Sequence, residues 1–174
     1  MNKAEIITAS HKIFGEFSDY CLNISDVIFF KQPADKWSIA QNVDHIIIST
    51  RQTRLAYLLP KFIVRLYTGK PNRPSRSYDE LVKKYHAKLE AGGKASGVFI
   101  PKIITGVSKE KLMNSWMKIS AAYINILDKN WKDEQLDNYL APHPLLGKIT
   151  LRELCYFTIY HTGHHLNIIK QRNQ

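Results

Sequence analysis

Apolar residues recur at spacings of three and four along most of this chain, and this periodicity limits its possible folds more than any other feature. The first periodic stretch runs from Ala4 to Val27. Its repeating apolar positions are Ile7, Phe14, Phe17, Cys21, Ile24 and Ile28. Such spacing places apolar side chains on one face of an α-helix.

Comparable patterns predict three more helices. The second is expected from Ser38 to about Leu66, the third from Ser108 to about Trp131 and the fourth from Thr150 to about Arg172. No long stretch of the chain has a credible strand pattern. We therefore expect an all-α fold, a four-helix bundle.

Residues that start or stop helices lie between these stretches. Pro33 ends the first helical pattern, and Ser38 is a suitable N-cap for the second. Thr150 is followed three residues later by Glu153, which is the form of a capping box. Residues 139–148, with the sequence YLAPHPLLGK, contain two prolines and a glycine and cannot be helix interior.

A long irregular insertion separates the second and third predicted helices. Between Thr68 and Ser108, glycines and prolines punctuate the chain, and only Tyr78 to Glu90 has a helical pattern. The short run from Val98 to Ile104 is the one strand-like piece. Connections of this length are typically lids, interface elements or disordered segments. This insertion is therefore a candidate to fold over a pocket.

The chain length indicates a single domain, residues 1–174, because 174 residues can form one hydrophobic core but hardly two. The sequence lacks both an uncharged apolar stretch of about 18 residues and a secretory signal, so we expect a cytoplasmic protein without a membrane segment. Cys21 and Cys155 have no disulfide-framework or metal-finger spacing and are predicted to be buried free thiols.

A formal net charge of +10 makes an anionic partner conceivable. However, lysine and arginine are spread along the chain. Their densest cluster, residues 70–76, contains Arg73 and Arg76 among prolines and reads as a loop. Nucleic-acid binding is therefore a minor alternative.

Two histidines lie one turn apart in the fourth predicted helix. His161 and His165 are about 40° apart on the helical wheel, and they continue the inward-facing stripe that contains Leu154 and Thr158. His164 lies on the flank. Two imidazoles in a bundle interior need partners that aliphatic neighbours do not supply, and a metal ion such as zinc or nickel would provide one. Alternatively, they are satisfied or solvent-facing histidines near a basic C-terminus.

Helical periodicity does not identify a third ligand. His45 in the second helix is a candidate, and its arc of the helix is polar. The polar residues on this arc are Ser38, Gln41, Asn42, Ser49 and Gln52. They could form an exposed face or a polar wall around a buried site, and the pattern leaves both possibilities open.

Two segments resemble the DinB/YfiT-like superfamily of bacterial proteins. They are KWSIAQNVDHI at residues 36–46 and HPLLGKITLRELCYFTIYHTGHHLNII at residues 143–169. The resemblance covers the order of all four helices, but the insertion has no counterpart in it. It implies that His45, His161 and His165 hold one divalent metal ion, zinc or nickel, and that the protein could be a homodimer. Several family members are thiol S-transferases that use bacillithiol, mycothiol or glutathione, and others are described as metal-dependent hydrolases.

Three neutral ligands would leave the ion its full charge, which lowers the pKa of a water or thiol and stabilises the attacking anion. The sequence has no HExxH motif to supply a general base, and Asp44 points about 100° away from its neighbour His45. The first hypothesis is a metal-dependent enzyme, with transfer of a small thiol to an electrophilic substrate ahead of hydrolysis. The alternative is a non-catalytic, stress-associated binding protein whose metal is structural, with His164 or Cys155 closing the coordination shell.

Four further residues have two interpretations each. His143, between two prolines, is expected to be a turn residue rather than part of a pocket mouth. Trp37 is expected to anchor the core rather than to stack on a substrate. Tyr160 and Glu153 could orient an imidazole or could belong to an ordinary helix surface.

Overall fold

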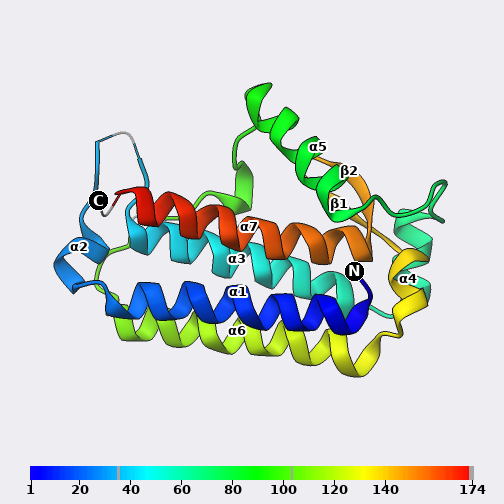
Figure 1. Ribbon diagram of the computed structural model, residues 1–174, viewed down its shortest axis with the longest axis horizontal. Coiled ribbons are helices and arrows are strands. Elements are labelled where there is room, and N and C mark those ends of the chain that lie inside the picture. The colour runs from blue at the N-terminus through cyan, green and yellow to red at the C-terminus, as the bar shows by residue number, and fades with distance from the viewer. Residues whose placement is uncertain (35, 103, 173–174) are drawn as a thin grey trace.

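Four long helices form the body of the protein. In the computed structural model, which describes residues 1–34, 36–102 and 104–172, they are α1 (Lys3–Asn23), α3 (Ile39–Leu58), α6 (Lys109–Asn130) and α7 (Leu151–Arg172). Helices α1 and α3 each pack against both α6 and α7, so the four helices close into a bundle around one core (Figure 1). The predicted all-α four-helix bundle is confirmed.

Short elements connect these helices. They are α2 (Asp26–Phe30), α4 (Lys61–Thr68), α5 (Tyr78–Glu90), the 3₁₀ helices η1 (Gly97–Phe99) and η2 (Asp133–Asp137), and the strands β1 (Leu140–His143) and β2 (Gly147–Thr150). The two strands pair antiparallel, with Ala141 opposite Ile149. Gly147, which begins β2, has a φ of +72°, a conformation that favours glycine. Residues 139–148 are therefore non-helical as expected, but the hairpin itself was not predicted.

The core is rich in aromatic side chains. Phe14 and Phe17 of α1 meet Trp116 of α6 edge to face, with ring centroids 5.2 and 5.3 Å apart. The predicted stripe of α1 is correct in its middle but not at its ends. Ile6 rather than Ile7 is fully buried, and Ile28 is 42% exposed.

The first helix ends earlier than predicted. Helix α1 stops at Asn23 instead of Val27, because Ile24 has an extended backbone and a new short helix follows. The ammonium group of Lys109 donates hydrogen bonds to the carbonyl oxygens of Leu22 and Ile24. These carbonyls have no partner within the helix, so a residue far away in the sequence stabilises the early end.

The second helix was also predicted too long. Helix α3 ends at Leu58, and Leu59 is extended at ψ 141° because the following Pro60 disfavours helical backbone there. A separate helix, α4, then begins at Lys61. Its apolar residues Phe62 and Leu66 are exposed.

The predicted helix starts are confirmed. Ser38 caps α3 by accepting a hydrogen bond from the backbone N–H of Gln41. Ser108 caps α6 in the same way. Thr150 and Glu153 form the predicted capping box of α7, in which each side chain accepts a hydrogen bond from the other residue's backbone N–H.

Glu153 also fastens the insertion to the bundle. Its buried carboxylate accepts hydrogen bonds from the guanidinium groups of Arg73, at 2.7 and 2.9 Å, and Arg76, at 3.1 Å. Burial alone would raise the pKa of Glu153, but Arg73 and the backbone N–H groups of Arg76 and Thr150 lower it below its ordinary value. The predicted loop at residues 70–76 is thus an anchored loop.

Parts of the insertion pack directly on helices of the bundle. Helix α5 has the predicted bounds and packs on α7, while η1 contacts α3 (Figure 1). The strand-like run from Val98 to Ile104 forms no strand within the described residues, and Ile103 lies outside them.

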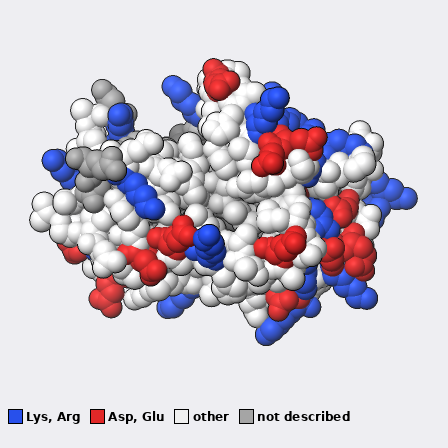
Figure 2. Space-filling model, in the orientation of Figure 1, with Lys and Arg blue, Asp and Glu red and all other residues white. Residues whose placement is uncertain are grey.

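Charged side chains are mixed over the face seen in Figure 2. Lysines and arginines alternate there with aspartates and glutamates and do not form one continuous basic stripe. In the part of the chain that the structure describes, no helix is both long and apolar enough to cross a lipid bilayer.

Candidate metal centre

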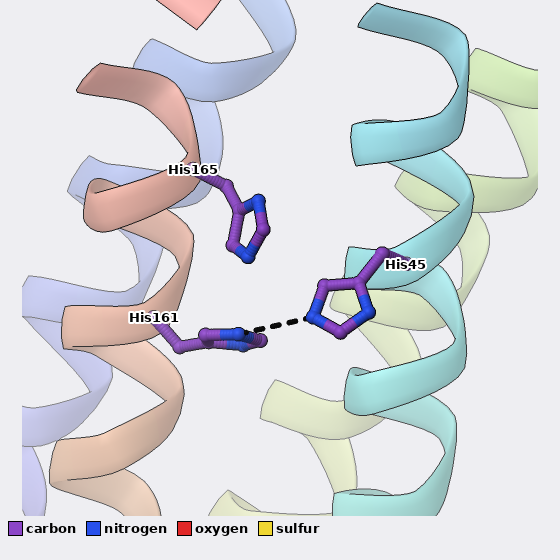
Figure 3. A group of neighbouring side chains, drawn as sticks. All are labelled: His45, His161 and His165. Carbon is purple, nitrogen blue, oxygen red and sulfur yellow. Dashed lines mark hydrogen bonds between the residues drawn. The ribbon is translucent and has the colours of Figure 1, made fainter. Parts of the chain in front are cut away.

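Three histidine side chains converge between helices α3 and α7 (Figure 3). His45 comes from the middle of α3, and His161 and His165 come from one face of α7. One ring nitrogen of each lies within 4.8 Å of the others, and all three side chains are buried. The structure therefore brings together the three residues that the sequence and the family resemblance singled out.

Hydrogen bonds orient two of these rings. Nδ1 of His45 lies 2.7 Å from the carbonyl oxygen of Phe99 in η1, and Nδ1 of His165 lies 2.8 Å from Oδ1 of Asn42. The amide nitrogen of Asn42 donates to the carbonyl oxygen of Ser38 at 2.8 Å, which settles which side-chain atom is the oxygen. Since both acceptors are oxygens, each Nδ1 carries the proton, and each Nε2 is the nitrogen whose lone pair can bind a metal ion.

Two of the Nε2 atoms are spaced as metal ligands would be. Nε2 of His45 lies 3.1 Å from Nε2 of His161. Two imidazole nitrogens on a tetrahedral zinc ion are separated by about 3.3 Å, given Zn–N bonds of about 2.0–2.1 Å. The hydroxyl of Ser49 lies 3.4 Å from Nδ1 of His161, on the far side of that ring. The donor set thus fits one borderline metal ion such as zinc.

The electrostatics of the site favour neutral imidazoles. Burial lowers the pKa of His45, and burial together with the neighbouring His165 and His45 lowers the pKa of His161 well below its usual value. A neutral ring is the form that binds a metal. The site can therefore accept an ion at pH 7 without first releasing protons from these two residues.

A pocket of about 590 Å³ lies beside the three histidines, all of which line it. Its walls are mainly apolar and come from α3, α5, α7, the hairpin and the insertion around η1. The expected folding of the insertion over a pocket is thus confirmed. Among the described residues that line this pocket there is no aspartate or glutamate.

The chain matches a known protein family over most of its length. The family model described as the DinB superfamily matches residues 16–169, most of the chain. The chain belongs to the DinB superfamily. The resemblance seen in two sequence segments is therefore confirmed.

A solved structure has a similar fold. It is reported as "YfiT from Bacillus subtilis is a probable metal-dependent hydrolase with an unusual four-helix bundle topology". The match has a TM-score of 0.63 and 16% sequence identity, and it covers 97% of this chain and 84% of the other. At this identity the likeness establishes the shared fold. A comparison with curated protein sequences gives no significant match.

Part of the polar arc of α3 borders this DinB site. The sequence left open whether that arc was exposed. The structure buries Ser38, Gln41, Asn42 and Ser49, whereas Gln52, at the pocket, is exposed. Asn42 and the carbonyl of Phe99, which orient the rings, were not predicted in that role. Asn42 was recognisable as a polar residue three positions before His45, whereas nothing in the sequence pointed to Phe99.

Two aromatic residues differ from their predicted roles. Trp37 packs against the metal-centre rings, 4.9 Å from His45 and stacked at 6.2 Å on His165, and it lines the pocket instead of anchoring the core. His143, expected to be a turn residue, is the last residue of strand β1; its Nδ1 accepts a backbone N–H from the following turn, and the residue lines the pocket. His164 lies on the flank as predicted, at the edge of the same pocket.

Other candidates do not join the centre. Tyr160 donates to or accepts from Nε2 of His86 at 2.6 Å, and Glu153 binds arginines, so neither orients a metal-centre imidazole. Asp44 does not line the pocket. Both cysteines are buried free thiols, as predicted, and burial raises the pKa of Cys155 to about 11.

Proposed function

We propose that this DinB protein is a metal-dependent enzyme that holds one zinc or nickel ion through His45, His161 and His165. The observation that carries the proposal is the convergence of three buried imidazole nitrogens beside a pocket. Imidazole ligands suit zinc, nickel and related borderline metals.

The number of protein ligands supports a reactive site over a structural one. Structural zinc sites have four protein ligands, whereas catalytic sites have three and keep a position open. Within the described residues, no fourth histidine, cysteine, aspartate or glutamate belongs to the group. In particular, Cys155 lies 3.0 Å from the hydroxyl of Tyr57 and is not part of it.

The pocket favours thiol transfer over hydrolysis. A bound divalent ion lowers the pKa of a water or thiol that reaches it. Hydrolysis commonly also uses a carboxylate as general base, and no carboxylate is found among the described residues of the pocket wall. A thiol bound to such an ion needs no separate base. We therefore propose an S-transferase that joins a low-molecular-weight thiol to an electrophile.

Metal-dependent hydrolysis is the second candidate. It is favoured by the likeness in fold to YfiT, which is described as a probable metal-dependent hydrolase. Three imidazoles with an open position are also the ligand set of zinc enzymes that activate water.

The test compares the two reactions in the same preparations. Zinc-loaded and nickel-loaded protein are assayed for conjugation of glutathione, cysteine or bacillithiol to 1-chloro-2,4-dinitrobenzene, and separately for hydrolysis of p-nitrophenyl acetate. Thiol-dependent product that disappears in His161→Ala and on chelation supports the transferase. The matched control is His11→Ala, at an exposed position of α1, and it should retain activity.

The other results are equally clear. Turnover of the ester without any effect of thiols would replace the transferase with a hydrolase. Full metal occupancy with no activity in either assay would favour the non-catalytic binding protein.

A further inference from the structure

His143 belongs both to the hairpin and to the pocket. It is the last residue of β1, it is only 9% exposed, and it lines the same cavity as His45, His161 and His165. None of the roles proposed above uses its ring.

Two backbone groups decide which nitrogen of His143 carries the proton. The N–H of Leu145 donates to Nδ1 over 3.2 Å, and the N–H of Leu146 donates to the same atom over 3.1 Å. A ring nitrogen that accepts hydrogen bonds has no proton, so in the neutral ring the proton is on Nε2. Burial lowers the pKa of His143 to about 4, which keeps the ring neutral at pH 7. His143 is therefore an uncharged N–H donor of fixed tautomer.

Among the described residues, none accepts a hydrogen bond from Nε2 of His143. Because Nδ1 is engaged by the turn, the Nε2 edge of the ring is left for the pocket that His143 lines. Nε2 of His143 is not among the buried side-chain atoms that lack a partner, so it is accessible from the pocket, and an acceptor there can satisfy it.

The donor lies close to the metal centre, in apolar surroundings. The ring of Phe157 contacts His143 at a centroid distance of 4.2 Å and His161 at 4.7 Å, so one phenyl ring separates the donor from a metal-centre imidazole. Nearby parts of the pocket wall are supplied by Leu89 and Leu145. A ligand beside these residues would meet hydrocarbon and the N–H group of His143, while polar side chains such as Gln52 and Lys94 line other parts of the pocket.

We propose that the pocket binds a molecule with a mainly hydrocarbon body and a carbonyl oxygen, and that this oxygen accepts a hydrogen bond from Nε2 of His143. That such a molecule is the substrate rests on the function proposed above, whereas its binding does not. Such a site selects for the acceptor, because an analogue without it covers the Nε2–H group of His143 and leaves that group unpaired.

The test uses two ligands of nearly the same shape, 2-acetylnaphthalene and 2-ethylnaphthalene. Their affinities for zinc-loaded protein are measured by titration calorimetry or by ligand fluorescence. The ketone should bind roughly fivefold more tightly, the ratio that a net hydrogen bond of about 1 kcal/mol gives. His143→Asn should remove this preference and leave the affinity for the hydrocarbon nearly unchanged.

Asparagine is chosen because its side-chain oxygen can accept the same two backbone N–H groups and so keep the turn, while it withdraws the donor from the pocket. The matched control is His11→Asn, which is exposed and outside the pocket. A measurement on the unaltered protein removes any dependence on how the variant folds. In ¹⁵N-histidine NMR spectra, the Nε2–H signal of His143 should shift with the ketone and stay in place with the hydrocarbon.

Equal affinities of the two ligands for the unaltered protein, no binding of either, or an Nε2–H signal that ignores the ketone would each overturn the proposal. Repeating the titration after chelation separates it from the proposed function. A ketone preference that persists in protein inactive towards thiols and esters would contradict only the enzyme. Thiol transfer without any ketone preference would contradict only the role of His143.

Discussion

Asn42 offers a strong test of how the protein prepares the proposed metal centre. Its side-chain oxygen accepts the Nδ1–H of His165 over 2.8 Å, and its amide nitrogen is held by the carbonyl of Ser38. Asn42 is 1% exposed and His165 is 6% exposed, so water cannot readily replace the lost oxygen. In Asn42→Ala the imidazole loses the acceptor that fixes its tautomer and orientation.

The expected effect follows from this hydrogen bond. Removing the partner of a metal-binding histidine typically lowers metal affinity by about 10–100-fold, which corresponds to about 1.4–2.8 kcal/mol. We expect the dissociation constant for Zn²⁺ to rise about 30-fold in Asn42→Ala. Asn42→Asp keeps an acceptor oxygen at the same place and should stay within about threefold of the unaltered protein.

The assay is competition for Zn²⁺ against a chromophoric chelator at pH 7.5. The control is Gln41→Ala, which removes the Gln41 oxygen that accepts the backbone N–H of Ser38 over 2.9 Å at the same end of α3. That change should lower the free energy of unfolding by about 1 kcal/mol and leave the zinc affinity unchanged. The reasoning is refuted if Asn42→Ala binds zinc within twofold of the unaltered protein, or if Gln41→Ala weakens binding as much.

Three further outcomes are expected. Because the folded pKa of His143 is about 4 against an ordinary value of 6.5, the unfolded chain takes up the proton first. The neutral ring therefore contributes fully to the free energy of unfolding above pH 6.5. In metal-free protein this free energy should fall by about 3 kcal/mol between pH 6.5 and pH 4. Urea unfolding that gives the same free energy across this pH range would contradict the prediction. Glu153→Gln should lower the free energy of unfolding by about 2–3 kcal/mol and speed hydrogen exchange in α5, because Arg73 and Arg76 lose their charged partner. Unchanged exchange in α5 would mean that these ion pairs do not anchor the insertion. Leu66→Ser should change the free energy of unfolding by less than about 0.5 kcal/mol since Leu66 is 79% exposed, and a larger loss would show that α4 is covered in solution.

Helix starts could be predicted from the sequence because they depend on a few adjacent residues. Ser38 and Thr150 each form hydrogen bonds with a residue three positions away, and both caps are present. The helix ends were harder. The stop at Asn23 is stabilised by Lys109 from another helix, which no local pattern reveals. The break before α4 was signalled locally by Pro60, and the strength of the apolar pattern around it obscured that signal.

The candidate site was predictable only in part, because some of its contacts join residues that are far apart in the sequence. His161 and His165 share a face of one helix, so their proximity follows from helical geometry. The meeting with His45 depends on how α3 rotates against α7, and only the family resemblance indicated it. The contact between His45 and the carbonyl of Phe99 joins residues 54 positions apart through an irregular segment, and no periodicity encodes such a contact.

The coordination of the bound ion tests the central claim most directly. X-ray absorption spectroscopy of zinc-loaded protein, with metal content measured on the same sample, should give one ion per chain. The ion should be bound by three imidazole nitrogens and at least one light oxygen or nitrogen atom from outside the chain, and the signal should be lost in His45→Ala. A sulfur ligand, a fourth imidazole or zinc bound well below one ion per chain would contradict an open centre formed by His45, His161 and His165.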